Sequence, residues 1–234
     1  MEKTITVPSS HQHEDAFDGV HGFVKLVDVM PRPAETDGPL KCDAAIVQAA
    51  RVSYGDGTKK TSTDVGLVRY LLRNQHTSPF EMVEFKFHIK CPIFVARQWL
   101  RHRTASVNEI SARYSVMKDE FYNVAPGEVR KQSASNKQCS VPIEEAQVDE
   151  ETNDIYSQYM EKPNESYKLY SKLIDRGVAR EVARIHLPVS LMTEFYWKID
   201  LHNLYRFLSL RMDCLLYTSP SPRDRTRSRM PSSA

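Results

Sequence analysis

The chain has 234 residues, of which 41% are hydrophobic and 26% are charged, and its formal net charge is +2. That length fits one domain able to bury a sizeable core, and the composition is typical of a soluble globular protein. No apolar run approaches the roughly 18 residues that a membrane-spanning helix needs, and residues 1–20 lack the apolar centre of a signal peptide. We therefore expect a cytoplasmic protein with no membrane segment, a disordered stretch at residues 1–20 and one domain over residues 21–213.

The first half of that domain alternates strand and helix patterns. Residues 23–30 (FVKLVDVM) are apolar and β-branched, which predicts a strand. Residues 43–54 have helical apolar spacing, and Thr63 or Asp64 can cap a second helix that ends near Asn74. The connection over residues 76–82 should leave the helical conformation before Pro79.

The clearest strand is residues 83–91, VEFKFHIKC, where apolar side chains alternate with Glu84, Lys86, His88 and Lys90. This alternation predicts one buried face and one face in water. Pro92 then suits the first turn of a helix that continues through PIFVARQWLRHR, residues 92–103.

The second half begins with residues 124–165, which are polar and read as a variable surface insertion. A helix follows and ends at Gly177; a short helix is then stopped by Pro188. Residues 193–199 (TEFYWKI) predict a strand, and Asp200 can cap a final helix. The pattern as a whole predicts a mixed α/β (α+β) chain without internal repeats.

The four cysteines, Cys42, Cys91, Cys139 and Cys214, have neither a CxxC pattern nor Cys/His ligand spacing. The sequence therefore indicates neither a metal site nor a disulfide framework. None of Cys42, Cys91 and Cys139 lies in a segment that would activate a thiol, so no nucleophilic cysteine is predicted.

The last 21 residues, CLLYTSPSPRDRTRSRMPSSA, do not continue the helical periodicity before them. Their composition is typical of a disordered basic tail, but the string also resembles the translation of a transposon-based sequencing adapter. We therefore interpret residues 214–234 as a non-native tail and leave them out of the fold. Without the four arginines and one aspartate of this tail the formal charge falls from +2 to −1, which weakens a nucleic-acid-binding function.

Residues 101–114, RHRTASVNEISARY, concentrate cations and small polar side chains. On a helix, Arg101 and His102 share one arc with Gln98, whereas Arg103 points away. The spacing alone is equally consistent with a helix end whose cations face water. The following residues favour a nucleotide pocket, because arginine forks, serine hydroxyls and free amides at the next helix start bind phosphate, and Glu109, if buried among cations, would stay ionised.

This stretch matches throughout the RHRxxSxNExSxRY signature of the flavin-dependent thymidylate synthases, the ThyX family. The signature has nine fixed positions and is therefore highly specific. Further segments resemble the family in the same order between Phe23 and Asp213: FVKLVDVM, AARVSY, HTSPFE, FKFHIKCPIFVARQW, GVAREVARIHLP and NLYRFLSLRMD. Family members continue past Asp213 into another helix, so we expect this chain to be a C-terminally truncated reading frame that is less stable than an intact homologue.

The resemblance implies a ThyX-like fold with an antiparallel-containing sheet, and a homotetramer with shared active sites. It implies reductive methylation of dUMP to dTMP, with methylenetetrahydrofolate as carbon donor and NADPH as reductant through FAD. It assigns the following residues to FAD: Ser53, Ser78, Arg101, His102, Arg103, Glu109, Asp200, His202 and Arg206. It assigns the following to dUMP: Gln98, Arg101, Glu109, Ile110, Ser111, Ala112, Arg113, Arg184 and Arg211. Arg211 is also the expected catalytic residue, placed by the uracil to favour ionisation at N3.

Three alternatives accompany this interpretation. Ser111 is read as a ligand contact rather than a nucleophile, because no adjacent base can be assigned. A single-stranded nucleic-acid-binding module would use Arg101, Arg103, Arg113 and Tyr114 as a stacking platform, but the near-neutral charge disfavours it. A truncated, catalytically inactive homologue would keep the fold alone.

Overall fold

The computed structural model describes residues 22–31, 42–52, 63–124, 130–134, 140–142 and 150–211. Its centre is a four-stranded sheet in the order β1-β2-β6-β3, with every neighbouring pair antiparallel. The strands of this sheet are β1 (Phe23–Met30), β2 (Glu84–Pro92), β6 (Met192–Asp200) and β3 (Ser106–Glu109). Apart from it, β4 (Arg130–Gln132) pairs with β5 (Ser140–Pro142). The mixed α/β (α+β) class predicted from the sequence is confirmed.

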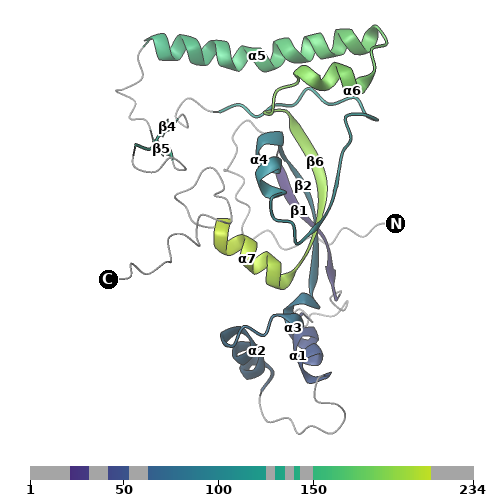
Figure 1. The fold of residues 1–234 in the computed structure, drawn as a ribbon, viewed down its shortest axis with the longest axis vertical. Coiled ribbons are helices and arrows are strands. Elements are labelled where there is room, and N and C mark those ends of the chain that lie inside the picture. The colour runs from purple at the N-terminus through teal and green to yellow at the C-terminus, as the bar shows by residue number, and fades with distance from the viewer. Residues whose placement is uncertain are drawn as a thin grey trace.

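The helices occupy the two ends of the sheet and one of its faces (Figure 1). The first group, at one end, is α1 (Cys42–Val52), α2 (Asp64–Arg73) and α3 (Ser78–Glu81). The second, beside the sheet face, is α4 (Ile93–Trp99) and α7 (Leu201–Arg211). The third, at the other end, is α5 (Glu150–Asp175), α6 (Arg180–Ala183) and the 3₁₀ turn η3 (Arg184–His186). None of the helices described here has an apolar stretch long enough to cross a bilayer.

The covered face of the sheet is aromatic. Because β6 is extended, alternate side chains of this strand point to one face, and Phe195, Trp197 and Ile199 are all at most 2% exposed. Trp99 of α4 contacts the Trp197 ring edge-on at 5.3 Å between centroids, and Phe207 of α7 lies 5.0 Å from Trp197. This packing fixes the C-terminal end of α4 next to the second half of α7.

The opposite face of the sheet carries polar side chains, as the alternation in residues 83–91 predicts, but Lys90 on this face is buried. That side chain was expected in water, yet Lys90 is only 7% exposed. Its Nζ lies 2.7 Å from Oε2 of Glu120, in a segment that follows β3. Contact with the segment around Glu120 explains the burial of Lys90. The alternation of residues along one strand cannot predict an ion pair between residues so far apart in the sequence.

The cap of α2 is observed as predicted. Thr63 is the N-cap, its Oγ1 accepts a hydrogen bond from the Gly66 amide at 3.2 Å, and Asn74 is the C-cap. In the connection that follows, the chain leaves the helix at Gln75, whose φ is +55°. The chain therefore leaves α2 before Pro79, as predicted. It then forms the short helix α3, with Pro79 in its first turn, and this helix was not predicted.

Replacing Thr63 with alanine should lower the free energy of unfolding by about 1 kcal/mol, because the Gly66 amide loses its acceptor at a helix start. Denaturant unfolding of the two proteins measures this difference. Thr77→Ala is the matched control, since Thr77 is the N-cap of α3 but makes no capping hydrogen bond through its side chain. Equal losses in the two variants would contradict a specific capping role for Thr63.

Two predicted segments differ from the structure. The helix expected over residues 92–103 ends at Trp99, with Pro92 as its N-cap instead of its first helical residue. Residues 124–165 contain the β4–β5 pair and the first part of α5, which continues through Pro163. Proline inside a polar helix is uncommon, and this disguised the helix in the sequence. The predicted helix stop at Gly177 is confirmed, with φ +77°.

Candidate active site

The segment that carries the signature leaves α4 through a tight turn. The amides of Leu100, Arg101 and His102 donate to the carbonyls of Ala96, Gln98 and Trp99. The chain then becomes the edge strand β3, which was not predicted from the sequence. Helical spacing therefore does not set the directions of Arg101, His102 and Arg103, and the helix start expected after them is absent. The strand instead separates two groups of side chains by about 10 Å of extended backbone.

The first group is centred on His102, which we call the histidine cluster: Arg101, His102, Arg103, Arg206 and Arg211. Arg211, near the end of α7, donates through Nε to His102 Nε2 at 3.1 Å, and its Nη2 lies 2.8 Å from the same atom. A ring nitrogen that accepts from a guanidinium carries no proton, so His102 is neutral here, with its proton on Nδ1. The Phe207 ring packs edge-on against the imidazole at 4.8 Å.

The electrostatics of the cluster agree with a neutral imidazole. Burial lowers the pKa of His102 below its usual 6.5, and the positive charges of Arg211 and Arg206 lower it further. Arg101, Arg103 and Arg206 are exposed and have no ion-pair partner among the residues that the structure describes. The cluster is therefore a surface of excess positive charge with one oriented guanidinium, the Arg211 side chain.

The lowered pKa predicts a pH dependence of stability. The folded state binds fewer protons than the unfolded state between the usual pKa of about 6.5 and the lower folded value. The contribution of neutral His102 is therefore complete above about pH 6.5 and is lost as pH falls through that window. Melting temperatures measured across this range should fall less steeply for His102→Gln, which keeps an acceptor for Arg211 but does not titrate. Identical pH profiles of the two proteins would contradict the assignment.

Glu109 lies at the other end of β3. It was expected to be a buried acid among cations, but it is exposed, and its Oε1 accepts a hydrogen bond from Thr193 Oγ1 at 2.6 Å. The short edge strand explains the exposure, since nothing covers β3 on its outer side within the described part of the chain. Its carboxylate remains available to accept further hydrogen bonds.

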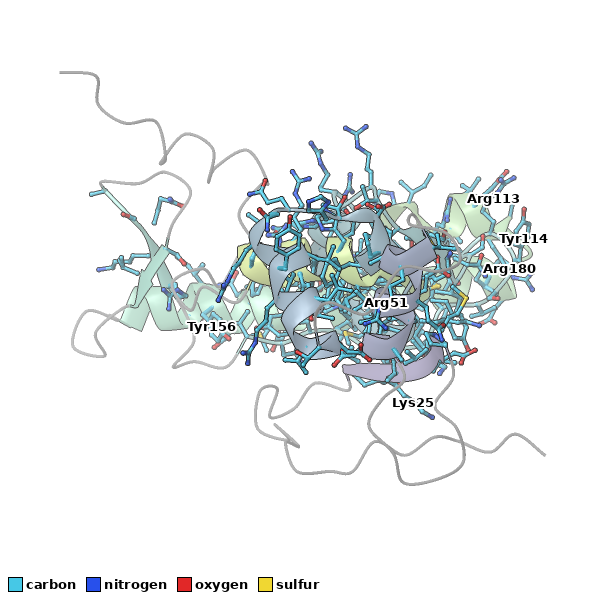
Figure 2. All side chains as sticks on the ribbon, turned by 90° about the horizontal axis from the view of Figure 1, so that it is seen from below. Lys25, Arg51, Arg113, Tyr114, Tyr156 and Arg180 are labelled. Atoms are coloured by element: carbon cyan, nitrogen blue, oxygen red, sulfur yellow. The ribbon has the colours of Figure 1, made fainter. Side chains whose placement is uncertain are left out.

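The second group, which we call the arginine cluster, is Arg113, Arg180 and Arg184 with Glu181. Figure 2 shows Arg113, Tyr114 and Arg180 together at one edge of the molecule. Arg113 Nε lies 3.2 Å from Glu181 Oε2, and Arg180 Nη1 donates to the Tyr114 carbonyl at 3.3 Å. Arg184 is half-buried where α6 passes into η3. Both partners of the Arg113–Glu181 pair are 55% exposed, so this ion pair contributes little to stability.

Of the other residues predicted to bind dUMP, some already use their hydrogen-bonding groups within the protein. Gln98 is half-buried in the last turn of α4. The Ile110 amide already donates to the Glu194 carbonyl at 2.9 Å, and the Ser111 hydroxyl accepts from the Arg113 amide at 3.3 Å. Ala112 is half-buried beside the Met117 core.

Three predicted flavin contacts lie near the start of α7 or α3. The two carboxylate oxygens of Asp200 accept from the Asn203 amide at 2.8 Å and from its side chain at 2.7 Å, which confirms Asp200 as a cap. His202 is half-buried in the first turn of α7, and Ser78 begins α3, which packs against the same turn through Phe80 and Leu201. Ser53 lies outside the described residues.

The thiols give no sign of activation. Burial, and then the nearby Glu109 carboxylate, raise the pKa of Cys91 to about 12. Burial also raises the pKa of Cys42. Both thiols therefore stay protonated near neutral pH, while Cys139 and Cys214 lie outside the described residues.

Sequence reasoning missed Thr193, Glu181 and Arg180 as partners of signature residues. The sequence pattern places Glu181 and Arg180 only in the short helix before Pro188, and Thr193 only in the strand predicted over residues 193–199. Each meets its partner across a large sequence separation, so local pattern carries no signal for it. The acceptor role of His102 toward Arg211 was hidden for the same reason.

Comparison with known proteins agrees with the resemblance of the signature. Residues 37–214 match the family model described as thymidylate synthase complementing protein. The chain is 59% identical over 193 residues to a flavin-dependent thymidylate synthase of Dictyostelium discoideum, covering 82% of this chain and 62% of that relative. It is 56% identical over 212 residues to a flavin-dependent thymidylate synthase of Thermus thermophilus, covering 91% and 68% respectively. The chain thus spans about two thirds of the length of these relatives or slightly less.

A solved structure is similar as well. The crystal structure of a UMP/dUMP methylase, PolB from Streptomyces cacaoi bound with 5-Br UMP, gives a TM-score of 0.65 at 33% sequence identity. The match covers 82% of this chain and 77% of that one.

Proposed function

We propose that this chain, which belongs to the thymidylate synthase complementing protein family, is a flavin-dependent thymidylate synthase. It would convert dUMP to dTMP with methylenetetrahydrofolate as carbon donor and NADPH as reductant through FAD. The observation that carries the proposal is the pair of cationic clusters at the two ends of β3: the histidine cluster, which contains Arg211, and the arginine cluster, which contains Arg184. Two separate cationic clusters suit a dinucleotide cofactor and a nucleotide substrate bound side by side.

The histidine cluster has the donor chemistry that FAD requires. A guanidinium group binds two phosphate oxygens at once through its fork of N–H donors. Arg101, Arg103 and Arg206 have no carboxylate partner in the described part of the chain, so their donors are available to a pyrophosphate. Ser78, His202 and Ser53 would add polar contacts to the flavin, whereas Asp200 serves mainly as the cap of α7. When bound, FAD supplies the reducing equivalents that it takes from NADPH.

The arginine cluster would hold the phosphate of dUMP. Arg184 is half-buried, so its charge is less screened by water than that of a surface arginine. Arg113 is held by Glu181 through an exposed, weak ion pair. A phosphate dianion can therefore displace Glu181 from the Arg113 guanidinium at a small cost in free energy. Ser111 and Ala112 would add backbone contacts, and Gln98 and Glu109 would contact the nucleoside.

Arg211 is the residue proposed to act on the base. Its guanidinium, oriented by neutral His102, would stabilise negative charge at N3 of uracil when the ring is activated for methylation. A cation that is positioned before the reaction stabilises developing charge without first reorganising. This role needs no nucleophilic side chain, which agrees with the raised thiol pKa values of Cys91 and Cys42.

Titration of the purified chain with FAD tests the proposal. We expect a yellow protein whose flavin absorbance changes when dUMP is added, and weaker FAD binding by Arg103→Ala. Arg73→Ala, an exposed substitution at the end of α2, should bind FAD like the wild type. Failure to bind FAD even with dUMP present would contradict the proposal.

We further propose a cytoplasmic homotetramer with shared active sites. The exposed arginines of the histidine cluster support this assembly, because a neighbouring subunit can complete the flavin site over Arg101 and Arg103. Sedimentation at equilibrium should give four times the chain mass, and a purely monomeric protein that binds FAD would contradict a shared site.

A further inference from the structure

Two tyrosines of α5 hold both backbone groups of one residue, Met117. The Tyr167 hydroxyl donates to the Met117 carbonyl at 2.8 Å, and the Met117 amide donates to the Tyr170 hydroxyl at 3.1 Å. Tyr170 is 1% exposed and Met117 is 5% exposed. The tyrosines are three positions apart and therefore share one face of the helix. Two hydroxyls on one peptide segment fix its position in a way that apolar packing alone does not.

Met117 is the buried fixed point of an otherwise exposed loop. The loop follows Arg113 and has no helix or strand of its own up to Glu120. Tyr114 is 73% exposed and Val116 is 48% exposed. The loop continues directly from Glu109–Arg113, the run that the proposed function assigns to dUMP. The position of Met117, four residues after Arg113, therefore limits where the nucleotide-binding run can lie.

The other contacts of the loop come from the same end of the molecule. Arg180 and Glu181 of α6 hold Tyr114 and Arg113, and α6 packs against α5 around Ala183 and Tyr170. At its far end the loop is held by the Lys90–Glu120 ion pair and by the Met192 amide, which donates to the Glu120 carbonyl at 2.8 Å. The α5 helix thus connects to Arg113 and Arg180 of the arginine cluster through α6.

We propose that Tyr167 and Tyr170 are positioning residues for nucleotide binding: by holding Met117, they keep the Glu109–Arg113 run in the form that binds dUMP. This inference rests on the proposed function. The packing of the Tyr170 ring belongs to the core, but phenylalanine supplies the same ring. The hydroxyl is therefore the group assigned to positioning, and a Tyr→Phe change isolates it.

The test uses the FAD-loaded full chain and compares Tyr170→Phe and Tyr167→Phe with Tyr159→Phe, a control on the exposed side of α5. Calorimetric titration should show dUMP binding about tenfold weaker for Tyr170→Phe, since a buried amide loses its acceptor. FAD affinity should stay within about twofold, because the histidine cluster lies at the other end of β3. In turnover, KM for dUMP should rise while kcat at saturating dUMP is kept.

Three outcomes decide the matter. If both hydroxyl variants bind dUMP like the wild type, the positioning role is wrong. If FAD binding and dUMP binding fall in equal proportion, the substitutions only lower the fraction of protein that is folded, and the positioning role is again wrong. If the FAD-loaded wild type itself does not bind dUMP, the proposed function fails and the inference fails with it. Tyr167→Phe keeps the Met117 amide bonded, so it provides a milder variant if Tyr170→Phe folds poorly.

Discussion

Arg211→Ala is expected to lower the rate of tritium release from C5 of labelled dUMP by about 10²- to 10³-fold, the range found when one preorganised donor to a developing anion is removed. The guanidinium of Arg211 is held at His102 by two contacts of 3.1 and 2.8 Å, so its charge is already oriented in the absence of substrate. Removing it leaves the uracil anion without its proposed counter-charge. The loss should lie mainly in kcat, because the interaction strengthens as charge develops.

The control for this variant is Arg176→Ala, which removes an exposed arginine after α5. It should release tritium at the wild-type rate. Arg211→Lys keeps the charge but not the planar fork, and we expect an intermediate rate. An Arg211→Ala protein that binds FAD and dUMP and turns over normally would remove Arg211 from the chemistry.

Arg184→Ala is expected to raise KM for dUMP about 10- to 100-fold, because a charge-assisted hydrogen bond to phosphate is lost from a half-buried position. The phosphate is remote from the reacting carbon, so its binding is equal in the ground state and the transition state. The effect should therefore appear in KM and leave kcat nearly unchanged. Steady-state kinetics with dUMP as the varied substrate measures both constants.

Deoxyuridine provides a matched control for the phosphate assignment. This nucleoside lacks the phosphate, so its weaker binding should be the same in the wild type and in Arg184→Ala. If the variant loses affinity for dUMP and deoxyuridine to the same extent, Arg184 does not contact the phosphate.

The strands and helices that could be predicted are those whose apolar side chains repeat on one face, because only that face packs against neighbouring elements. β2 and β6 alternate because one face packs on α4 and α7, and Thr63 caps α2 through contacts within four residues. The failures occur where a distant partner decides the local structure. β3 exists because β6 provides hydrogen bonds to a polar segment, and the polar start of α5 gave no apolar stripe by which to recognise it.

The candidate site divides in the same way. The residue types in the signature, together with its resemblance to the family, were sufficient to name Arg101–Arg103 and Glu109–Arg113 as candidate ligand-binding residues. The sequence did not give their relations: His102 as acceptor of Arg211, Glu181 as partner of Arg113, and Thr193 as donor to Glu109. Each of these joins elements that only the folded sheet brings together. The ligand roles of the individual residues stay predictions for the variants described above.

The most direct test of the account is tritium release from dUMP labelled at C5 by the purified chain with FAD, NADPH and methylenetetrahydrofolate, compared with the same mixture lacking each component in turn. Release should require FAD and should be about 10²- to 10³-fold slower in Arg211→Ala. Protein that holds both FAD and dUMP yet releases no tritium in the complete mixture would contradict the account and would identify the chain as a catalytically inactive member of the family.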